Sequence, residues 1–232
     1  MITKALAFSG GKDSWACLWL LKDQLHEINV IWVNTGKNYP EILETIDKAR
    51  LICPNFIEIK SDKEGQNAFH GLPSDVVPIN WTRIGQSVTG KKEVMVQAYI
   101  FCCLENIGMK LQQYCKDNGI TELYRGQRSD EGHKSEARDG SIFDGITYRQ
   151  PIENWTSEQV ISFNALHMEL PEHFRFNHSS MDCYDCTAYD EESKDRVEYM
   201  KVNHMDLYEE FKSKKVALNA AIYESVSTIN NY

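Results

Sequence analysis

The sequence contains no hydrophobic run long enough to cross a membrane. Its most apolar stretch near the N-terminus, Trp15 to Leu21, is far shorter than the ~20 residues that a bilayer requires. Residues Met1 to Lys4 lack the basic, apolar and small-residue regions of a signal peptide. We therefore expect no membrane segment, no secretion and a cytoplasmic location.

The chain also lacks an excess of basic charge. Its 25 basic and 34 acidic residues give a formal net charge of -9. Because nonspecific nucleic-acid binding depends on clustered Lys and Arg, this balance argues against broad phosphate-backbone binding and leaves only a local basic patch open. We find no internal repeat and no low-complexity tract. The length of 232 residues suits one α/β core with a small appendage.

Short apolar runs alternate with helical patterns in the first part of the chain. We expect strands at residues 4–8, 28–33 and 56–60, and helices that begin after Asp13 and at Pro40. This alternation predicts an α/β fold with a doubly wound, mostly parallel, Rossmann-like sheet, which binds ligands at the carboxyl ends of its strands. The glycine turns at residues 9–11 and 34–36 both lie at such ends.

The rest of the chain divides into loops, helices and one further strand. We expect long loops over residues 61–92, a helix over 93–117, a strand at 120–124, a turn at 140–145, and helices over 157–168 and 197–225. The predicted organisation is one domain over residues 1–190, followed by a helical C-terminal extension over 191–232.

The first glycine turn has the residues of a phosphate-binding loop. Its two glycines let the backbone approach an anion, the following helix N-terminus supplies a partial positive charge, and Lys12 adds a full one. The four residues that a classical P-loop places before its Gly-Lys pair are absent, which disfavours a GTPase or a motor-type ATPase. A plain glycine turn with a helix cap is the alternative. We predict that six residues bind phosphates: Ser9, Gly10, Gly11, Lys12, Asp13 and Ser14.

Four segments resemble one enzyme family. Phe8–Ser14 looks like the PP-loop of the adenine nucleotide α-hydrolases, and residues 34–41 (Asn-Thr-Gly-Lys-Asn-Tyr-Pro-Glu) look like a motif of the phosphoadenosine/adenosine phosphosulfate (PAPS/APS) reductases. Residues 126–131 and 151–156 resemble two later motifs of that family, in the same order. The resemblance covers about residues 4 to 188, and it implies the PP-loop fold and an adenine nucleotide ligand.

The matching motifs add further residues to the predicted site. Asn34, Thr35 and Gly36 are expected to bind the nucleotide, and Arg128 is well suited to pair with a phosphate or sulfate through its planar fork. The alternative for Arg128 is a surface ion pair with Asp130 or Glu131. We predict Lys12, Asp13 and Arg128 as the catalytic residues, with Asp13 helping to hold a Mg²⁺ ion.

Four of the seven cysteines form two close pairs, Cys102-Cys103 and Cys183-x-x-Cys186. Four thiolates suit a tetrahedral zinc ion or a [4Fe–4S] cluster. Adjacent cysteines on a helix point about 100° apart, which is awkward for one zinc ion and easier for a cluster. Zinc and plain buried thiols remain the alternatives. The other three cysteines, Cys17, Cys53 and Cys115, lie on apolar helix faces and are predicted core residues.

The four-cysteine pattern is similar to that of the APS reductase branch, with two departures. Those reductases carry a nucleophilic cysteine near the C-terminus, whereas no cysteine follows Cys186 here. They also place a basic residue soon after the adjacent cysteines, where the first candidate in this chain is Lys110. The charge environment of the cluster is therefore expected to differ.

Three functions are compatible with these residues. The first is a reductase-family enzyme that acts at the phosphate or sulfur end of ATP or an adenylyl sulfate, with an iron–sulfur cluster and a thioredoxin-like reductant. The second is an ATP-dependent sulfurtransferase or ATP pyrophosphatase that takes sulfur from a donor and modifies a nucleic acid or a small molecule. The third is a non-catalytic nucleotide-binding or redox-sensing module. A homo-oligomer is compatible with each of them.

Overall fold

The protein is represented by a computed structural model that describes residues 2–92, 94–132, 134–176, 181 and 183–229. Its internal contacts divide the chain into two compact units. The first unit comprises Met1–Asn34, Asn38–Lys60 and Met109–Asp182. The second unit comprises Thr35–Lys37, Ser61–Gly108 and Cys183–Tyr232.

A six-stranded sheet forms the centre of the first unit. Its strands are β1 (Lys4–Ala7), β2 (Ile28–Asn34), β3 (Phe56–Lys60), β6 (Glu122–Tyr124), β7 (Ile142–Phe143) and β8 (Ile146–Arg149). They lie in the order β3-β2-β1-β6-β8-β7, and every neighbouring pair is parallel except β7 with β8. The predicted mostly parallel α/β sheet is confirmed.

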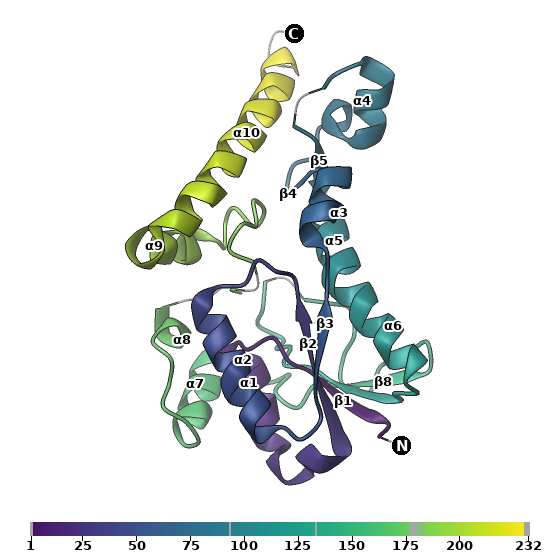
Figure 1. Ribbon diagram of the computed structural model, residues 1–232, viewed down its shortest axis with the longest axis vertical. Coiled ribbons are helices and arrows are strands. Elements are labelled where there is room, and N and C mark those ends of the chain that lie inside the picture. Colours follow the sequence, from purple (N-terminus) through teal and green to yellow (C-terminus); the bar gives the residue numbers. More distant parts are fainter. Residues whose placement is uncertain (1, 93, 133, 177–180, 182, 230–232) are drawn as a thin grey trace. The chain divides into compact units, whose positions relative to one another are not determined.

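Helices cover both faces of this sheet (Figure 1). The helices of the first unit are α1 (Lys12–Leu20), α2 (Pro40–Ile52), α6 (Met109–Asp117), α7 (Ser157–Ala165), α8 (His173–Phe176) and the 3-10 helix η1 (Lys22–Glu27). In Figure 1, α1, α2 and α7 lie on one side of the strands and α6 on the other. Cys115 of α6 packs on Ala5, Ile31 and Leu123 of the sheet, and its burial confirms it as a core residue.

The strand order places a switch point between β1 and β6. From β1 the chain adds β2 and β3 on one side, and it then returns to place β6 on the other side of β1. In open α/β sheets the crevice at such a reversal is where ligands bind. The turn after β1 carries Gly10, and the turn after β6 carries Gly126, so the two segments meet at the carboxyl edge of the sheet.

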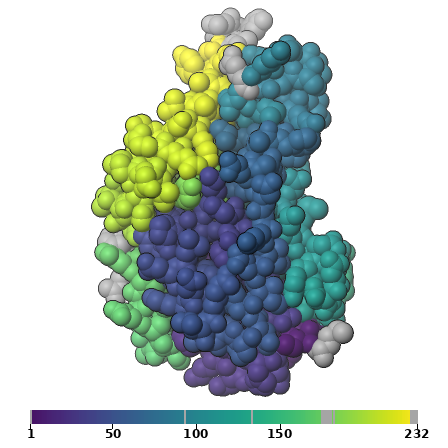
Figure 2. Space-filling view, viewed as in Figure 1, coloured from purple at the N-terminus to yellow at the C-terminus, as the bar shows by residue number. Residues whose placement is uncertain are grey.

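The second unit is built around a smaller sheet. Its strands β4 (Leu72–Ser74) and β5 (Val96–Ala98) pair in parallel, and a core of Trp81, Val96, Leu218 and Ala221 lies beside them. The other elements are α3 (Lys63–His70), the 3-10 helix η2 (Ile79–Trp81), α4 (Arg83–Thr89), α5 (Tyr99–Cys103), the π-helix η3 (Leu104–Gly108), α9 (Lys194–Asn203) and α10 (Met205–Ile229). Residues of α9 and α10 form the lime-to-yellow part of the surface in Figure 2.

Two sequence-based expectations are wrong in this unit. Residues 61–92 do not form only loops, because α3, β4 and α4 lie within them, and Asp62 and Thr82 accept backbone hydrogen bonds that cap the two helices. Residues 93–117 do not form one helix, because β5 begins at Val96 and a π-helical turn follows Cys103. The predicted C-terminal helices are confirmed as α9 and α10. The domain boundary at residue 190 remains a prediction.

Within the described part of the chain, no helix combines the length and the apolar character that a membrane span needs.

Candidate functional site

The predicted phosphate loop joins β1 to α1 in the first unit. Gly10 adopts a φ of +82°, a left-handed conformation that glycine accepts without strain. Gly11 is the N-cap of α1, and no side chain of the described residues caps this helix. The amide groups of its first turn therefore suit an anion, since they carry the positive end of the helix dipole. Ser14 hydrogen-bonds through its hydroxyl to the Gly11 carbonyl, 2.9 Å away.

Two residues that the sequence did not single out, Thr45 and Asn164, and Gly126 from the motif at residues 126–131 hold this loop in place. The Thr45 hydroxyl, on α2, donates to the Gly10 carbonyl at 3.0 Å. The Asn164 amide, on α7, donates to the Lys12 carbonyl at 2.8 Å and is fully buried. Gly126 lies so close to the loop that a Cβ atom there would be 2.7 Å from the Asp13 carbonyl carbon. The loop is thus fixed from α2, α7 and the end of β6.

Arg128 is tied to the phosphate loop through Asp13. Its side chain is only 7% exposed, and its guanidinium forms an ion pair with the Asp13 carboxylate, which also pairs with Lys12 at 3.0 Å. Asp130 accepts a second hydrogen bond from Arg128 at 2.9 Å. The two cations that we predict to bind phosphate are therefore joined by one carboxylate. The ion pair between Arg128 and Asp130, which was the alternative considered for Arg128, also forms. Arg128 makes it at the same time as its ion pair with Asp13 of the phosphate loop.

The second glycine turn contributes to both units. Asn34 ends β2 and donates to Glu58 at 2.8 Å, while it accepts from Asn38 at 2.9 Å. Thr35 belongs to the second unit, where its buried hydroxyl lies 3.4 Å from the Cys183 sulfur. Gly36, with a φ of +75°, is exposed. Nucleotide binding by these residues remains a prediction.

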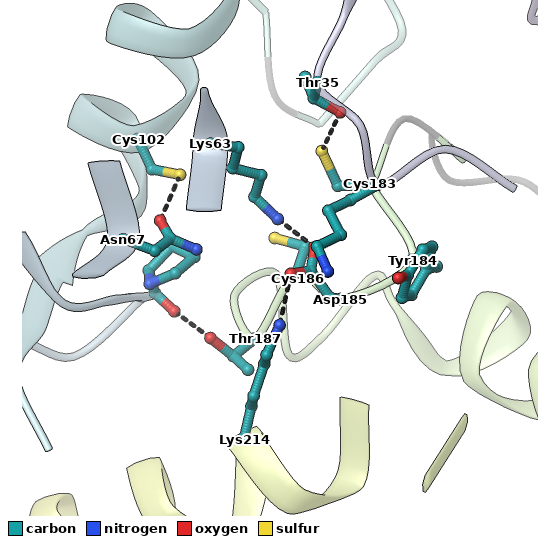
Figure 3. A network of polar contacts seen from close by, with 12 residues as sticks. Thr35, Lys63, Asn67, Cys102, Cys183, Tyr184, Asp185, Cys186, Thr187 and Lys214 are labelled. Atoms are coloured by element: carbon teal, nitrogen blue, oxygen red, sulfur yellow. Dashed lines mark hydrogen bonds and ion pairs between the residues drawn. The ribbon is translucent and has the colours of Figure 1, made fainter. Parts of the chain in front are cut away.

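The four paired cysteines all lie in the second unit. Cys102 and Cys103 end α5, whereas Cys183 and Cys186 lie in the loop before α9. The Cys102 thiol interacts electrostatically with the other three, and burial is the main cause that raises its pKa to about 12. Figure 3 shows Cys102, Cys183 and Cys186 around the Lys63 side chain.

Thiols are the donor type that a zinc ion or a [4Fe–4S] cluster needs, but the described residues do not bring these four cysteines together as a ligand set. Cys102 and Cys186 are buried and the other two are half-buried, so the thiols are shielded as the ligands of a cluster are. Among the residues that the structure describes, no three His, Cys, Asp or Glu side chains are close enough to hold a metal ion as they stand. The metal site therefore remains a prediction. Cys17 and Cys53 are buried in the first unit, as expected of core residues.

Comparison with protein-family models matches residues 3–189 to the phosphoadenosine phosphosulfate reductase domain. The chain belongs to this family. The match includes the phosphate loop, the end of β2 at Asn34, the segment after β6 that carries Arg128, and both cysteine pairs. The resemblance inferred from the motifs is thereby confirmed.

Solved structures show the same fold at low sequence identity. The phosphoadenylyl-sulfate (PAPS) reductase from Candida auris, in a phosphate complex, is 16% identical, with 77% of this chain and 80% of that chain covered and a TM-score of 0.51. A variant of the FMN adenylyltransferase from Candida glabrata is 12% identical, with 79% and 54% covered and a TM-score of 0.50. The chain thus spans about half the length of that adenylyltransferase. No curated protein sequence matches the chain.

The basic residue near the cysteines differs from the one that the reductase-family resemblance suggested. Lys110 is exposed on α6 of the first unit, whereas the cysteines belong to the second unit. Lys63, the first residue of α3, is instead buried among the thiols and forms an ion pair with Asp185. Burial lowers the pKa of Lys63, but Cys183 and Asp185 outweigh it and the pKa rises overall. No sequence pattern marked Lys63, because it lies in the segment expected to form loops.

Glu131, which lies beside Arg128, has a carboxyl group whose pKa is raised into the neutral range. Burial, and then the charge of Asp13, raise the pKa of its carboxyl from 4.5 to about 7, although Arg128 lies 3.8 Å away and opposes the shift. The folded chain thus holds a proton on Glu131 that the unfolded chain releases near pH 4.5. The stability that this proton contributes is complete below pH 4.5 and is lost as the pH rises to about 7.

We expect Glu131→Gln to remove the loss of stability that accompanies ionisation of Glu131 as the pH rises. The free energy of unfolding of the variant, relative to the unchanged protein, should increase by on the order of 2–3 kcal/mol between pH 4.5 and pH 8. Urea unfolding at both pH values measures the difference. Glu44→Gln, which removes an exposed carboxylate from α2, is the control. Equal pH profiles for Glu131→Gln and the unchanged protein would contradict the assignment.

Proposed function

We propose that this chain is an enzyme that binds an adenine nucleotide at the loop Ser9–Ser14 and acts at its phosphate or sulfur end. The single observation that carries the proposal is the junction of β1, α1 and β6. There a glycine turn and an uncapped helix N-terminus lie beside Lys12 and Arg128, at the switch point of the sheet. Membership of the phosphoadenosine phosphosulfate reductase family supports the adenine nucleotide as the ligand.

The charged residues around the loop favour a nucleotide that arrives with a magnesium ion. The two cations, Lys12 and Arg128, face three carboxylates, those of Asp13, Asp130 and Glu131. These five side chains carry no net positive charge to offset a triphosphate. Carboxylates together with substrate phosphates are the usual ligands of Mg²⁺ in nucleotide enzymes. Asp13 is therefore proposed to help hold Mg²⁺ when ATP binds.

Residues of the loop have distinct roles in this proposal. The α1 amides and the Ser9 and Ser14 hydroxyls bind phosphate oxygens and orient the nucleotide. Lys12 and Arg128 stabilise the charge that develops on these oxygens. Thr45 and Asn164 hold the loop backbone, so that the donors are in position before the ligand arrives.

We further propose that Cys102, Cys103, Cys183 and Cys186 hold a [4Fe–4S] cluster, with zinc as the alternative. When bound, such a cluster would supply one-electron chemistry or a local charge. Donor type, burial and mutual electrostatic interaction support the assignment. Iron and sulfide analysis after anaerobic purification tests it, and loss of a visible absorption band in Cys186→Ser would support it. Stoichiometric zinc without iron would favour the alternative.

Two reactions are compatible with this site, and product analysis separates them. A reductase converts an adenylyl sulfate to sulfite and an adenosine phosphate with electrons from a thioredoxin-like partner. A sulfurtransferase activates its substrate with ATP and releases pyrophosphate. The carboxylates around Arg128 favour the second reaction, since only ATP requires the metal ion for its leaving group. Sulfite from an adenylyl sulfate identifies the first, pyrophosphate from ATP the second, and binding without either product a non-catalytic module.

We expect Lys12→Ala to weaken nucleotide binding by about 1–3 kcal/mol, because it removes a charge-assisted contact to phosphate. The fold should persist, since the Lys12 carbonyl still accepts its bond from Asn164. Calorimetric titration with ATP and Mg²⁺, and separately with an adenylyl sulfate, measures the affinity.

Lys22→Ala is the matched control, because Lys22 is an exposed lysine of the same unit. It should leave the affinity unchanged. Equal affinity in Lys12→Ala and Lys22→Ala would refute the role of the loop.

A further inference from the structure

A cavity on the outer face of α7 has no part in the proposed function. The inner face of this helix carries the buried Val160 and Asn164, whereas the residues around the cavity are half-buried or exposed. The cavity has a volume of about 490 Å³ and lies within the first unit. Its lining consists of Trp155, Glu158, Gln159, Ser162 and Phe163. A cavity of this size can hold a small molecule.

Trp155 and Phe163 form an aromatic corner in this cavity. Their ring centroids lie 5.2 Å apart and their planes meet at 76°, so the two rings stand almost at right angles. Phe163 also makes an edge-to-face contact with His167, at 4.7 Å between centroids, and His167 stacks on Trp19 of α1. The corner is therefore supported by the packing of α7 on α1, while part of each of its two rings stays exposed.

The charged side chain in the lining of the cavity is acidic. Glu158 accepts hydrogen bonds from its own backbone amide and from the Thr156 hydroxyl, and these bonds lower the pKa of its carboxyl, which is therefore ionised at neutral pH. Arg128 contributes to the shift in the same direction, but it already pairs with Asp13 and Asp130. Among the described residues, the lining itself supplies no cation to balance Glu158.

Two aromatic faces with a carboxylate beside them suit an organic cation. The face of an aromatic ring is negative, and Trp is the strongest aromatic partner of a cation. A methylated ammonium group fits better than a primary one, because a primary ammonium is strongly hydrated and has to give up part of that water. Glu158 would repel an anion, and a neutral apolar group would leave its charge unmatched.

We propose that this cavity binds the methylated ammonium group of a small molecule, with Trp155 and Phe163 as its walls and Glu158 as its counter-charge. The side-chain carbonyl of Gln159 already accepts from the Thr156 backbone amide at 2.8 Å, so its NH₂ group is left to donate to the rest of the molecule. The inference goes beyond the proposed function, because it concerns a site separate from the phosphate loop.

The experiment titrates the full chain with two probes of the same shape and different charge. Choline carries a trimethylammonium group, and its neutral analogue is the alcohol in which a carbon atom replaces the nitrogen. Amide NMR should show saturable shifts at Glu158, Gln159 and Ser162 with choline, and about tenfold weaker binding of the neutral alcohol. Equal affinities for the two probes would overturn the proposal, and so would choline titrations without saturable shifts at these residues.

Variants test the two kinds of contact separately. Trp155→Leu should bind choline about tenfold more weakly, whereas Trp155→Phe keeps an aromatic wall and should stay within about threefold of the unchanged protein. Glu158→Gln should weaken choline binding about fivefold at low salt. Glu169→Gln removes another exposed carboxylate of the same unit and should leave the affinity unchanged. Unchanged choline affinity in both Trp155→Leu and Glu158→Gln would overturn the proposal.

Two further results keep this test independent of folding and of the proposed function. If Trp155→Leu does not fold, Glu158→Gln and the pair of probes still decide, because they leave the aromatic corner intact. Titration of the same variants with ATP and Mg²⁺ should give the affinity of the unchanged protein, since neither side chain belongs to the phosphate loop. Failure of choline binding with normal nucleotide binding would thus remove this site alone.

Discussion

Gly126→Ala is expected to weaken nucleotide binding more than tenfold and to destabilise the first unit. A Cβ atom at this position would lie 2.7 Å from the Asp13 carbonyl carbon, 2.8 Å from its oxygen and 2.9 Å from the Ser14 nitrogen. These are backbone atoms, so no side-chain rotation relieves the overlap and the start of α1 has to move. We expect an affinity loss of more than tenfold and a stability loss of about 1–3 kcal/mol, as for other overpacked sites.

The matched control for this substitution is Gly145→Ala. Gly145 has a φ of +78°, in the turn between β7 and β8, and a Cβ atom there meets no other atom within 4 Å. Alanine at this position introduces backbone strain of about 1 kcal/mol without a steric overlap. Affinity should therefore change only in Gly126→Ala. An equal loss in both variants, measured by titration with ATP and Mg²⁺, would show that the contact with Asp13 is irrelevant.

Asp185→Ala is expected to lower the free energy of unfolding by about 3–5 kcal/mol, since it leaves the buried Lys63 ammonium without its counter-charge. Both side chains of the pair are nearly inaccessible, at 3% and 2% exposed. Lys214 still has a partner in Glu210, 2.8 Å away, so the loss is centred on Lys63. Urea denaturation of the metal-free chain measures it.

Two companion variants decide whether that loss has the proposed cause. Asp190 is an exposed aspartate of the same loop as Asp185, and it pairs with Lys215 of α10. Asp190→Ala should lower the free energy of unfolding by less than about 1 kcal/mol. The double variant Lys63→Met, Asp185→Leu removes both buried charges, and it should recover most of the stability that Asp185→Ala loses. A double variant that is less stable than either single variant would contradict the argument.

The parallel sheet could be predicted from the sequence because its signals are local. The run at Phe56–Lys60 was placed correctly, since an apolar strand between polar turns has a recognisable pattern. The strand at Val96–Ala98 could not be predicted, because it has only three residues and is defined by its hydrogen bonds to β4, which lies more than 20 residues earlier in the chain. The helix α3 was missed for a similar reason: it has only eight residues, contains Gly65, and is defined by the cap at Asp62.

The site residues that the sequence predicted also differ from those it missed in whether a local pattern or a distant contact defines them. Lys12 and Arg128 belong to motifs that a short stretch of sequence defines. Thr45 and Asn164 act on the phosphate loop across 35 and 152 positions of the chain, respectively. Lys63 reaches Asp185 across 122 positions. Such contacts follow from the tertiary fold, and a single sequence carries no local pattern that reveals them.

The central sheet tolerates a long detour of the chain. After β3 ends at Lys60, residues 61–108 contribute to the second unit, and the chain rejoins the first unit at Met109. For a flexible connection, doubling its length changes the entropy of closure by only about 0.6 kcal/mol. Flexible connections within the detour can therefore lengthen or shorten at little thermodynamic expense, whereas loss of its helices and strands would remove packing from the second unit.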